Sequence, residues 1–179
     1  MLTFRLLPPR NQEKIHKIKG RRNTFGFINH RMKYYKPPHP SALNAKYAEI
    51  YNALRRLGDA IVPFAYDGIT VNQNNVCPIH YDKGNLGSSL IVSGGDYEGG
   101  ELRIEKEIRT SGPVGEWEEV DTCYNPFVFD GHRRHWNNDI VKGFKWSVVF
   151  FKLEILPKWL PAFPADVNDP NREYSLIDL

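Results

Sequence analysis

His80 and Asp82 are the residues whose types and spacing best suit metal chemistry in this sequence. They form a His-x-Asp pair within the stretch 79–102, IHYDKGNLGSSLIVSGGDYEGGEL. We expect the pair to lie on a strand, where both side chains project from one face because side chains alternate with a period of two. One further histidine would complete a 2-His-1-carboxylate set, which holds Fe(II) and leaves open coordination positions.

The third ligand has two candidates downstream, His132 and His135. Lys145 follows His135 by ten residues and lies among apolar residues that favour a strand. A buried ammonium needs an anionic partner. A co-substrate such as 2-oxoglutarate chelates iron through its keto-acid end and has a distal carboxylate that supplies this partner. The spacing between Lys145 and His135 therefore favours His135.

Short strands and turns are predicted for most of the chain. The sequence predicts strands over 2–7, 24–29, 69–72, 88–93, 102–108, 127–129 and 147–153. Clusters of glycine with aspartate or glutamate predict turns at 94–96 and 98–100. We expect a mainly β fold, a sandwich or barrel with a helix packed outside it.

That helix is predicted over 41–58. Ser41 is its expected N-cap and Gly58 its expected stop. Apolar residues recur between them at three- and four-residue spacing, which indicates one face packed on the core: Leu43, Tyr47, Ile50, Tyr51, Leu54 and Leu57. We interpret the helix as a scaffold for the site.

Length and composition indicate one domain over residues 1–179, with 41% hydrophobic and 13% aromatic residues. We divide it into a basic N-terminal segment (1–36), a support helix (41–58), a β-core (60–156) and a Pro-rich tail (157–179). No signal peptide or run of ~20 apolar residues is visible. We therefore expect a soluble, intracellular monomer without membrane contact. Cys77 and Cys123 are expected to be reduced and to carry no chemistry.

The net charge of +3 conceals an asymmetry. Residues 1–36 carry ten Lys and Arg and one acid, Glu13, so the rest of the chain carries a net −6. Aromatic residues are interleaved with these cations. This combination suits a nucleic-acid backbone, because cations neutralise phosphates and aromatic rings stack on bases. A solvated basic surface is the alternative interpretation.

Taken together, these motifs resemble the Fe(II)/2-oxoglutarate-dependent dioxygenases, which have a double-stranded β-helix (jelly-roll) fold. More narrowly, H-x-D-x-x-N-x-G-x-S, G-D-Y-x-G-G-E-L, F-D-G-x-x-x-H and G-x-K-W-S-x-V-F-F resemble the TET/JBP group, which oxidises 5-methylpyrimidines in nucleic acids. The similarity covers about residues 22–153. It implies His80, Asp82 and His135 as iron ligands and Lys145 as the 2-oxoglutarate anchor.

The resemblance also implies a role for four other residues. Asn23 and Asn85 are expected to contact the substrate base, Phe151 to stack on it, and Thr24 to contact the co-substrate. An amide both donates and accepts hydrogen bonds, so Asn85 leaves 5-methylcytosine and thymine open. Core packing of Phe151 is an alternative.

The implied reaction is oxidation of a pyrimidine 5-methyl group with release of succinate and CO2. The substrate would be nucleic acid, expected to be DNA, held by the basic N-terminal segment with the target base flipped out of the stack. Two alternatives stay open. Lys145 stands where the group usually has arginine, and lysine is typical of the prolyl-hydroxylase branch of protein hydroxylases. The chain could also be a non-enzymatic nucleic-acid-binding β-domain.

Overall fold

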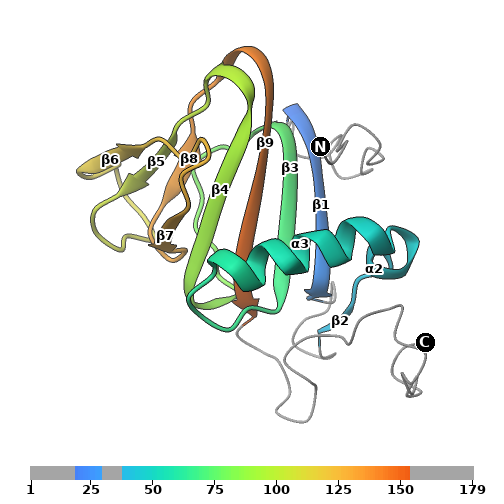
Figure 1. Ribbon diagram of the computed structural model, residues 1–179. Helices are drawn as coiled ribbons and strands as arrows, with labels where there is room; N and C mark the ends of the chain where they lie inside the picture. The colour runs from blue at the N-terminus through green and yellow to red at the C-terminus, as the bar shows by residue number, and fades with distance from the viewer. Residues whose placement is uncertain (1–18, 30–37, 154–179) are drawn as a thin grey trace.

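The computed structural model describes residues 19–29 and 38–153, which form two antiparallel sheets and a helix. The major sheet has the order β2-β1-β3-β9-β4-β7, and the minor sheet has the order β6-β5-β8 (Figure 1). The strands are β1 (Lys19–Ile28), β2 (His39–Pro40), β3 (Gly68–Val76), β4 (Asn85–Gly99), β5 (Leu102–Glu105), β6 (Trp117–Val120), β7 (Phe127–Asp130), β8 (His135–Asn137) and β9 (Ile140–Leu153).

The central strand β9 divides its residues between two environments. Val148 and Phe150 face a core that includes Phe25, Tyr51 and Leu54. Alternate residues of β9 face the space between the sheets, where a second, smaller core packs around Ile91, Leu102, Ile104 and Phe129. The period of two thus gives β9 one face that stabilises the fold and another that is available to a site.

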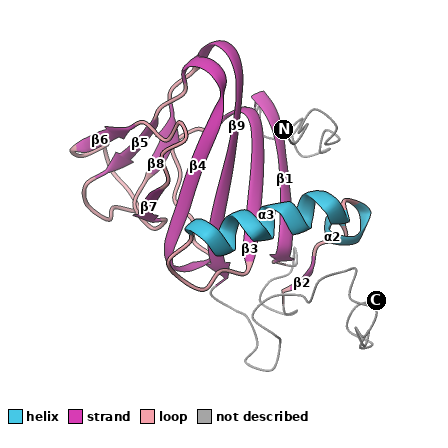
Figure 2. Ribbon diagram, viewed as in Figure 1, coloured by secondary structure: helices cyan, strands magenta, loops and turns pink. Residues whose placement is uncertain are grey.

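Helical residues cover the outer face of the major sheet (Figure 2). They form α2 (Leu43–Lys46) and α3 (Ala48–Ile61), separated at Tyr47, whose backbone is not helical. All six apolar residues of the predicted stripe pack in or against the core beneath the helix, so the scaffold interpretation is confirmed. Within the described chain no helix has the length and apolar character needed to cross a membrane.

Gly58 does not stop the helix, which continues to Ile61. Its Cα lies so close to Tyr66 that a Cβ would come within 2.4 Å of the tyrosine hydroxyl. Glycine is therefore explained here by packing rather than by a helix end.

The predicted turns at 94–96 and 98–100 are wrong over 94–99, which lie in β4. Gly94, Gly95 and Asp96 pair in register with Trp146, Lys145 and Phe144 of β9. The glycines still matter locally, because Gly95 has φ of +119° and its Cα faces the carbonyl of Phe144. Pairing with β9 thus overrides the local turn preference.

Other boundaries also differ from prediction. β1 begins five residues before the expected strand and pairs with β3, so part of the basic segment 1–36 belongs to the β-core. β6 was not predicted. The expected strand over 2–7 and the tail over 157–179 lie outside the described residues. Cys77 and Cys123 are both free thiols.

Asp67 is a buried carboxyl group at the junction of β1, β3 and β9. Its backbone bonds to Phe27 and Phe151, and its side chain accepts a 3.4 Å hydrogen bond from the Leu153 amide. Burial raises the pKa of Asp67 to about 6. An ionised Asp67 is thus disfavoured in the folded state.

We predict that Asp67 makes unfolding easier as the pH rises. The pKa of Asp67 is higher in the folded state than in the unfolded state. The contribution of the protonated carboxyl group to folding stability is therefore fully present below about pH 4 and is lost as the pH rises through about 6. The Asp67→Asn variant does not titrate and should gain on the order of 2 kcal/mol over the wild type at pH 7.5 but little at pH 4. Urea unfolding measures both, with exposed Asp96→Asn as control. An equal gain at both pH values would contradict the prediction.

Candidate active site

His80 and His135 are joined by their backbones. The His80 amide donates to the His135 carbonyl at 3.1 Å, and the His135 amide donates to the His80 carbonyl at 2.8 Å. This antiparallel bridge brings the two imidazole centroids to 4.3 Å. The predicted choice of His135 agrees with this geometry, because His132 bonds to Asp130 at 2.9 Å instead.

The His80-x-Asp82 pair lies on the segment between β3 and β4 and not on a strand, so that prediction is wrong. The same-face argument therefore does not explain how the pair converges. Backbone contacts do: the bridge to His135 fixes His80, and the Asp82 amide donates to the Gly131 carbonyl at 2.8 Å. Both contacts come from the segment that carries His135.

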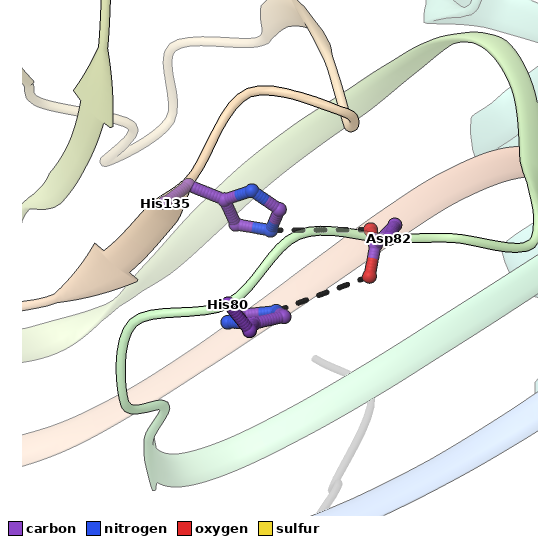
Figure 3. Close-up of side chains that lie close together, drawn as sticks. All are labelled: His80, Asp82 and His135. Carbon is purple, nitrogen blue, oxygen red and sulfur yellow. Dashed lines mark ion pairs between the residues drawn. The ribbon is translucent and has the colours of Figure 1, made fainter. Parts of the chain in front are cut away.

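The Nε2 atoms of His80 and His135 both point at Asp82 (Figure 3). Nδ1 of His80 lies 2.8 Å from the Pro78 carbonyl, and Nδ1 of His135 lies 2.8 Å from the Arg133 carbonyl. A carbonyl only accepts, so each Nδ1 carries a proton, and in the neutral ring Nε2 carries the lone pair. Nε2 of His80 also lies 3.8 Å from the Cys77 thiol. Each Nε2 lies 3.9 Å from a carboxylate oxygen of Asp82.

One ligand atom from each of these three residues lies within 4.8 Å of the others. Ligands that share an ion at about 2.1 Å lie about 3 Å apart when adjacent, so side-chain rotations that move these atoms by about 1 to 2 Å bring the set to bonding distance. Two imidazoles and one carboxylate are the donor set of non-haem Fe(II) sites with open positions. The chemistry and the tautomers of the residues fit such an ion.

The two histidines differ in electrostatic environment. Burial, together with the neighbouring His80 ring, holds the pKa of His135 below its usual value. Burial also acts to lower the pKa of His80, but contacts with Cys77, Asp82 and Pro78 outweigh it and raise the pKa. His135 is thus held in the neutral form that a metal ion requires.

A buried ion pair anchors the strand that carries His135. Arg134 donates two 2.6 Å hydrogen bonds to the carboxylate of Glu105, which is fully buried on β5. Arg134 also donates to the carbonyls of Gly112 and Pro113, so the pair ties the loop after β5 to β8. This network was not predicted, because it depends on the pairing of β5 with β8.

The three candidate ligands line a cavity of about 960 Å³ between the sheets. Amide and hydroxyl side chains dominate its polar lining: Asn29, Asn72, Asn75, Asn85, Asn137, Thr24, Thr70 and Ser147. The Asn72 side-chain nitrogen donates to the Ser147 hydroxyl at 3.3 Å, and the Asn75 side-chain nitrogen donates to the Asn72 side-chain oxygen at 3.3 Å. The cavity therefore offers many hydrogen-bonding groups on a connected wall.

The structure places three of the other predicted residues in this cavity. Thr24 and Phe151 line it, and the Thr24 hydroxyl lies 3.1 Å from that of Thr70. Phe151 lies across Gly68, which has no side chain to block the ring. Asn85 lines the cavity and donates to Asp82 at 3.1 Å and to Ser89 at 3.2 Å.

Asn23 is not among the residues that line the cavity. It pairs with Val71, whose side chain packs in the core beneath the helix, whereas its neighbours Arg22 and Thr24 line the cavity. The structure therefore places Asn23 outside the cavity wall, and its contact with the substrate base stays a prediction. Strand alternation is the reason, because adjacent residues project from opposite faces.

Lys145 lies on the site-facing side of β9, one alternation from Ser147. It is 4% exposed and donates to the Gly100 carbonyl, but it is not among the residues that line the cavity. Burial lowers the pKa of Lys145. The structure thus buries the ammonium on the side of β9 that carries Ser147, two residues before it in the strand.

Several cavity residues were not predicted as contacts. Arg22 and Lys83 add two cations, and the Lys83 ammonium lies 5.1 Å from the ring centroid of Tyr81, which also lines the cavity. Tyr81 and Lys83 flank Asp82, and Arg22 precedes Asn23. Proximity to those motifs was the available sequence signal for all three.

Comparisons with known proteins support the fold. No protein-family model matches the sequence, and no curated protein matches it. Among solved structures, NgTET1 in complex with 5mC DNA aligns with a TM-score of 0.51 at 12% identity, over 74% of this chain and 61% of that chain. The double-stranded β-helix fold is confirmed. The predicted resemblance to the TET/JBP group holds at the level of this fold.

Two other solved structures align less closely. A 2OG-Fe(II) oxygenase family oxidoreductase from Burkholderia pseudomallei gives a TM-score of 0.49 at 18% identity, over 74% of this chain and 64% of that one. A Pseudomonas putida prolyl-4-hydroxylase gives 0.41 at 13% identity, over 83% and 78%. This chain therefore spans less than two thirds of NgTET1 and of the Burkholderia protein.

Metal binding should depend on His80 and not on His132. We expect His80→Ala to weaken Mn(II) binding by more than the roughly 10- to 100-fold that loss of a ligand's hydrogen-bond partner costs. His132→Ala is the matched control, because this partly exposed histidine lies outside the three-residue cluster. Anaerobic calorimetry gives both affinities. Equal binding by the wild type and His80→Ala would show that the cluster is not the metal site.

Proposed function

We propose that the protein is an Fe(II)- and 2-oxoglutarate-dependent dioxygenase that oxidises the 5-methyl group of a pyrimidine in nucleic acid. The observation that carries the proposal is the convergence of two Nε2 atoms, from His80 and His135, on the Asp82 carboxylate in a polar cavity. The fold shared with NgTET1 supports it.

Iron held by His80, Asp82 and His135 would supply O2 activation beside the substrate methyl group. The overall reaction consumes one 2-oxoglutarate and one O2 for each methyl oxidised. One oxygen atom enters the hydroxymethyl product and the other enters succinate, with release of CO2. The chain contributes ligand geometry, co-substrate binding and a pocket that presents one methyl group.

Lys145 is the proposed anchor for the distal carboxylate of 2-oxoglutarate, with Thr24 as a further contact to the co-substrate. No described carboxylate lies within ion-pair distance of the buried Lys145 ammonium, although Glu101 and Asp121 attract it from farther away, and the Gly100 carbonyl uses only one of its three donors. A buried cation in this state is stabilised by an anionic ligand. Lys145 lies on the same side of β9 as Ser147, which lines the cavity, and this placement supports the proposed role.

A nucleic-acid substrate is supported by the cavity itself. Its amides and hydroxyls suit the hydrogen-bonding edge of a base, and the cations Arg22 and Lys83 suit nearby phosphates. The base would be flipped out of the stack, with Phe151 available to stack on it. The basic segment 1–36 would hold the backbone.

Asn85 favours 5-methylcytosine over thymine. Asp82 can only accept, so the group that Asn85 directs at it is the amide nitrogen, which Ser89 also contacts. The side-chain oxygen is the group left for a ligand. The substituent next to a pyrimidine methyl is an amino group in cytosine and a carbonyl in thymine, and only the amino group donates to this oxygen.

The test is oxidation of single- and double-stranded oligonucleotides that contain 5-methylcytosine or thymine. With Fe(II), 2-oxoglutarate and O2, we expect mass spectrometry of digested product to show 5-hydroxymethylcytosine in several-fold excess over oxidised thymine. The Asn85→Ala variant should lose overall rate, because Asp82 loses a partner, and should also lower the cytosine-to-thymine ratio. The ratio isolates the base contact because the metal effect is common to both substrates.

The alternatives give different outcomes in the same assay. Succinate formation stimulated by a proline-containing peptide but by no oligonucleotide would select a protein hydroxylase, which Lys145 also suits. Oligonucleotide binding without iron-dependent turnover would select a non-enzymatic binding domain. Absence of any oxidised base would exclude the proposed substrate.

A further inference from the structure

The Lys145 side chain lies in a defined seat formed by the stretch 95–102. Its ammonium donates to the Gly100 carbonyl and lies 5.1 Å from the ring centroid of Tyr97. Both residues belong to the motif GDYEGGEL, which the iron ligands do not explain. The motif and the lysine are distant in sequence but adjacent through the pairing of β4 with β9.

Gly100 is suited to this seat by its missing side chain. A Cβ there would lie 3.3 Å from Lys145 Cδ and 3.5 Å from Nζ, and 3.0 Å from Ile140. Its φ of +73° is also one that glycine adopts without strain. A side chain there would press on Ile140 and on Lys145 Cδ, which would have to shift by a few tenths of an ångström.

Tyr97 is itself held in place. Its hydroxyl lies 3.1 Å from the Ser93 hydroxyl, and Ser93 lies 2.5 Å from the Thr122 hydroxyl. Ser93 is fully buried and Thr122 nearly so. These contacts hold the Tyr97 ring by its hydroxyl group, at the edge of the ring. The face of the ring lies toward the Lys145 ammonium.

We propose that Tyr97 and Gly100 are positioning residues that hold the Lys145 ammonium in the place where it would bind the distal carboxylate of the co-substrate. This inference rests on the proposed function. The aromatic face and the carbonyl compensate the desolvated cation while the co-substrate is absent, and they leave donors of the ammonium available to it. Selectivity for a dicarboxylic keto acid is the expected consequence.

The test compares two ligands that differ only at the distal end, 2-oxoglutarate and 2-oxopentanoate. Both carry the keto-acid group, but only 2-oxoglutarate has the second carboxylate. Anaerobic calorimetry with the Mn(II)-loaded full chain measures each affinity directly. We expect Tyr97→Leu to weaken 2-oxoglutarate binding about 3- to 30-fold, the range of a cation–π contact, and to leave 2-oxopentanoate binding unchanged.

Tyr97→Phe is the matched variant, because it keeps the ring and removes only the hydroxyl. It should retain at least half of the wild-type affinity for 2-oxoglutarate. Thermal unfolding of each variant, followed by circular dichroism, establishes that the folded proteins are being compared. If Tyr97→Leu does not fold, the same comparison is made with Tyr97→Met, which also lacks the aromatic face.

Lys145→Ala separates the inference from the proposed function. If Lys145→Ala loses 2-oxoglutarate affinity and Tyr97→Leu does not, the positioning role of Tyr97 is wrong, while the role of Lys145 as the co-substrate anchor is supported. Equal weakening of both ligands by Tyr97→Leu would also overturn the seat, because it would indicate general damage to the site. Unchanged 2-oxoglutarate binding by Lys145→Ala would overturn the anchor and the seat together.

Discussion

The backbone bridge between His80 and His135 is the constraint on which the site depends. Two hydrogen bonds join a connecting segment after β3 to the start of β8, and the Asp82 amide adds a third contact to Gly131. These bonds place three donor groups together although none of them lies within a long strand. The buried Glu105–Arg134 pair holds β8 against β5, so the minor sheet fixes the position of His135 and, through the bridge, of His80.

Strand β9 links the stability of the fold to the proposed chemistry. Val148 and Phe150 fill the core beneath the helix, while Ser147, Val149 and Phe151 line the cavity. Because the side chains alternate, a shift of one residue in register would exchange the two sets and destroy both core and site. The core that positions β9 therefore also fixes which side of the strand carries Lys145.

The sequence was sufficient for the features that depend on residue type and local period. The grouping of His80, Asp82 and His135, the apolar face of the helix and the side of β9 that carries Lys145 were all predictable, the first with help from family resemblance. Strand alternation places Asn23 on the face opposite Thr24, which the family resemblance did not indicate. The length of β4 through its glycines, and the seat of Lys145, depend on pairing with β9, which no local signal encodes.

The proposed function requires that the cavity couple 2-oxoglutarate to O2 at the site formed by His80, Asp82 and His135. Turnover under ¹⁸O2 with a 5-methylcytosine oligonucleotide tests this coupling most directly. We predict that each succinate formed carries one ¹⁸O atom and that succinate and oxidised base accumulate in a ratio near one. Succinate without ¹⁸O, or oxidised base formed without succinate, would contradict the account.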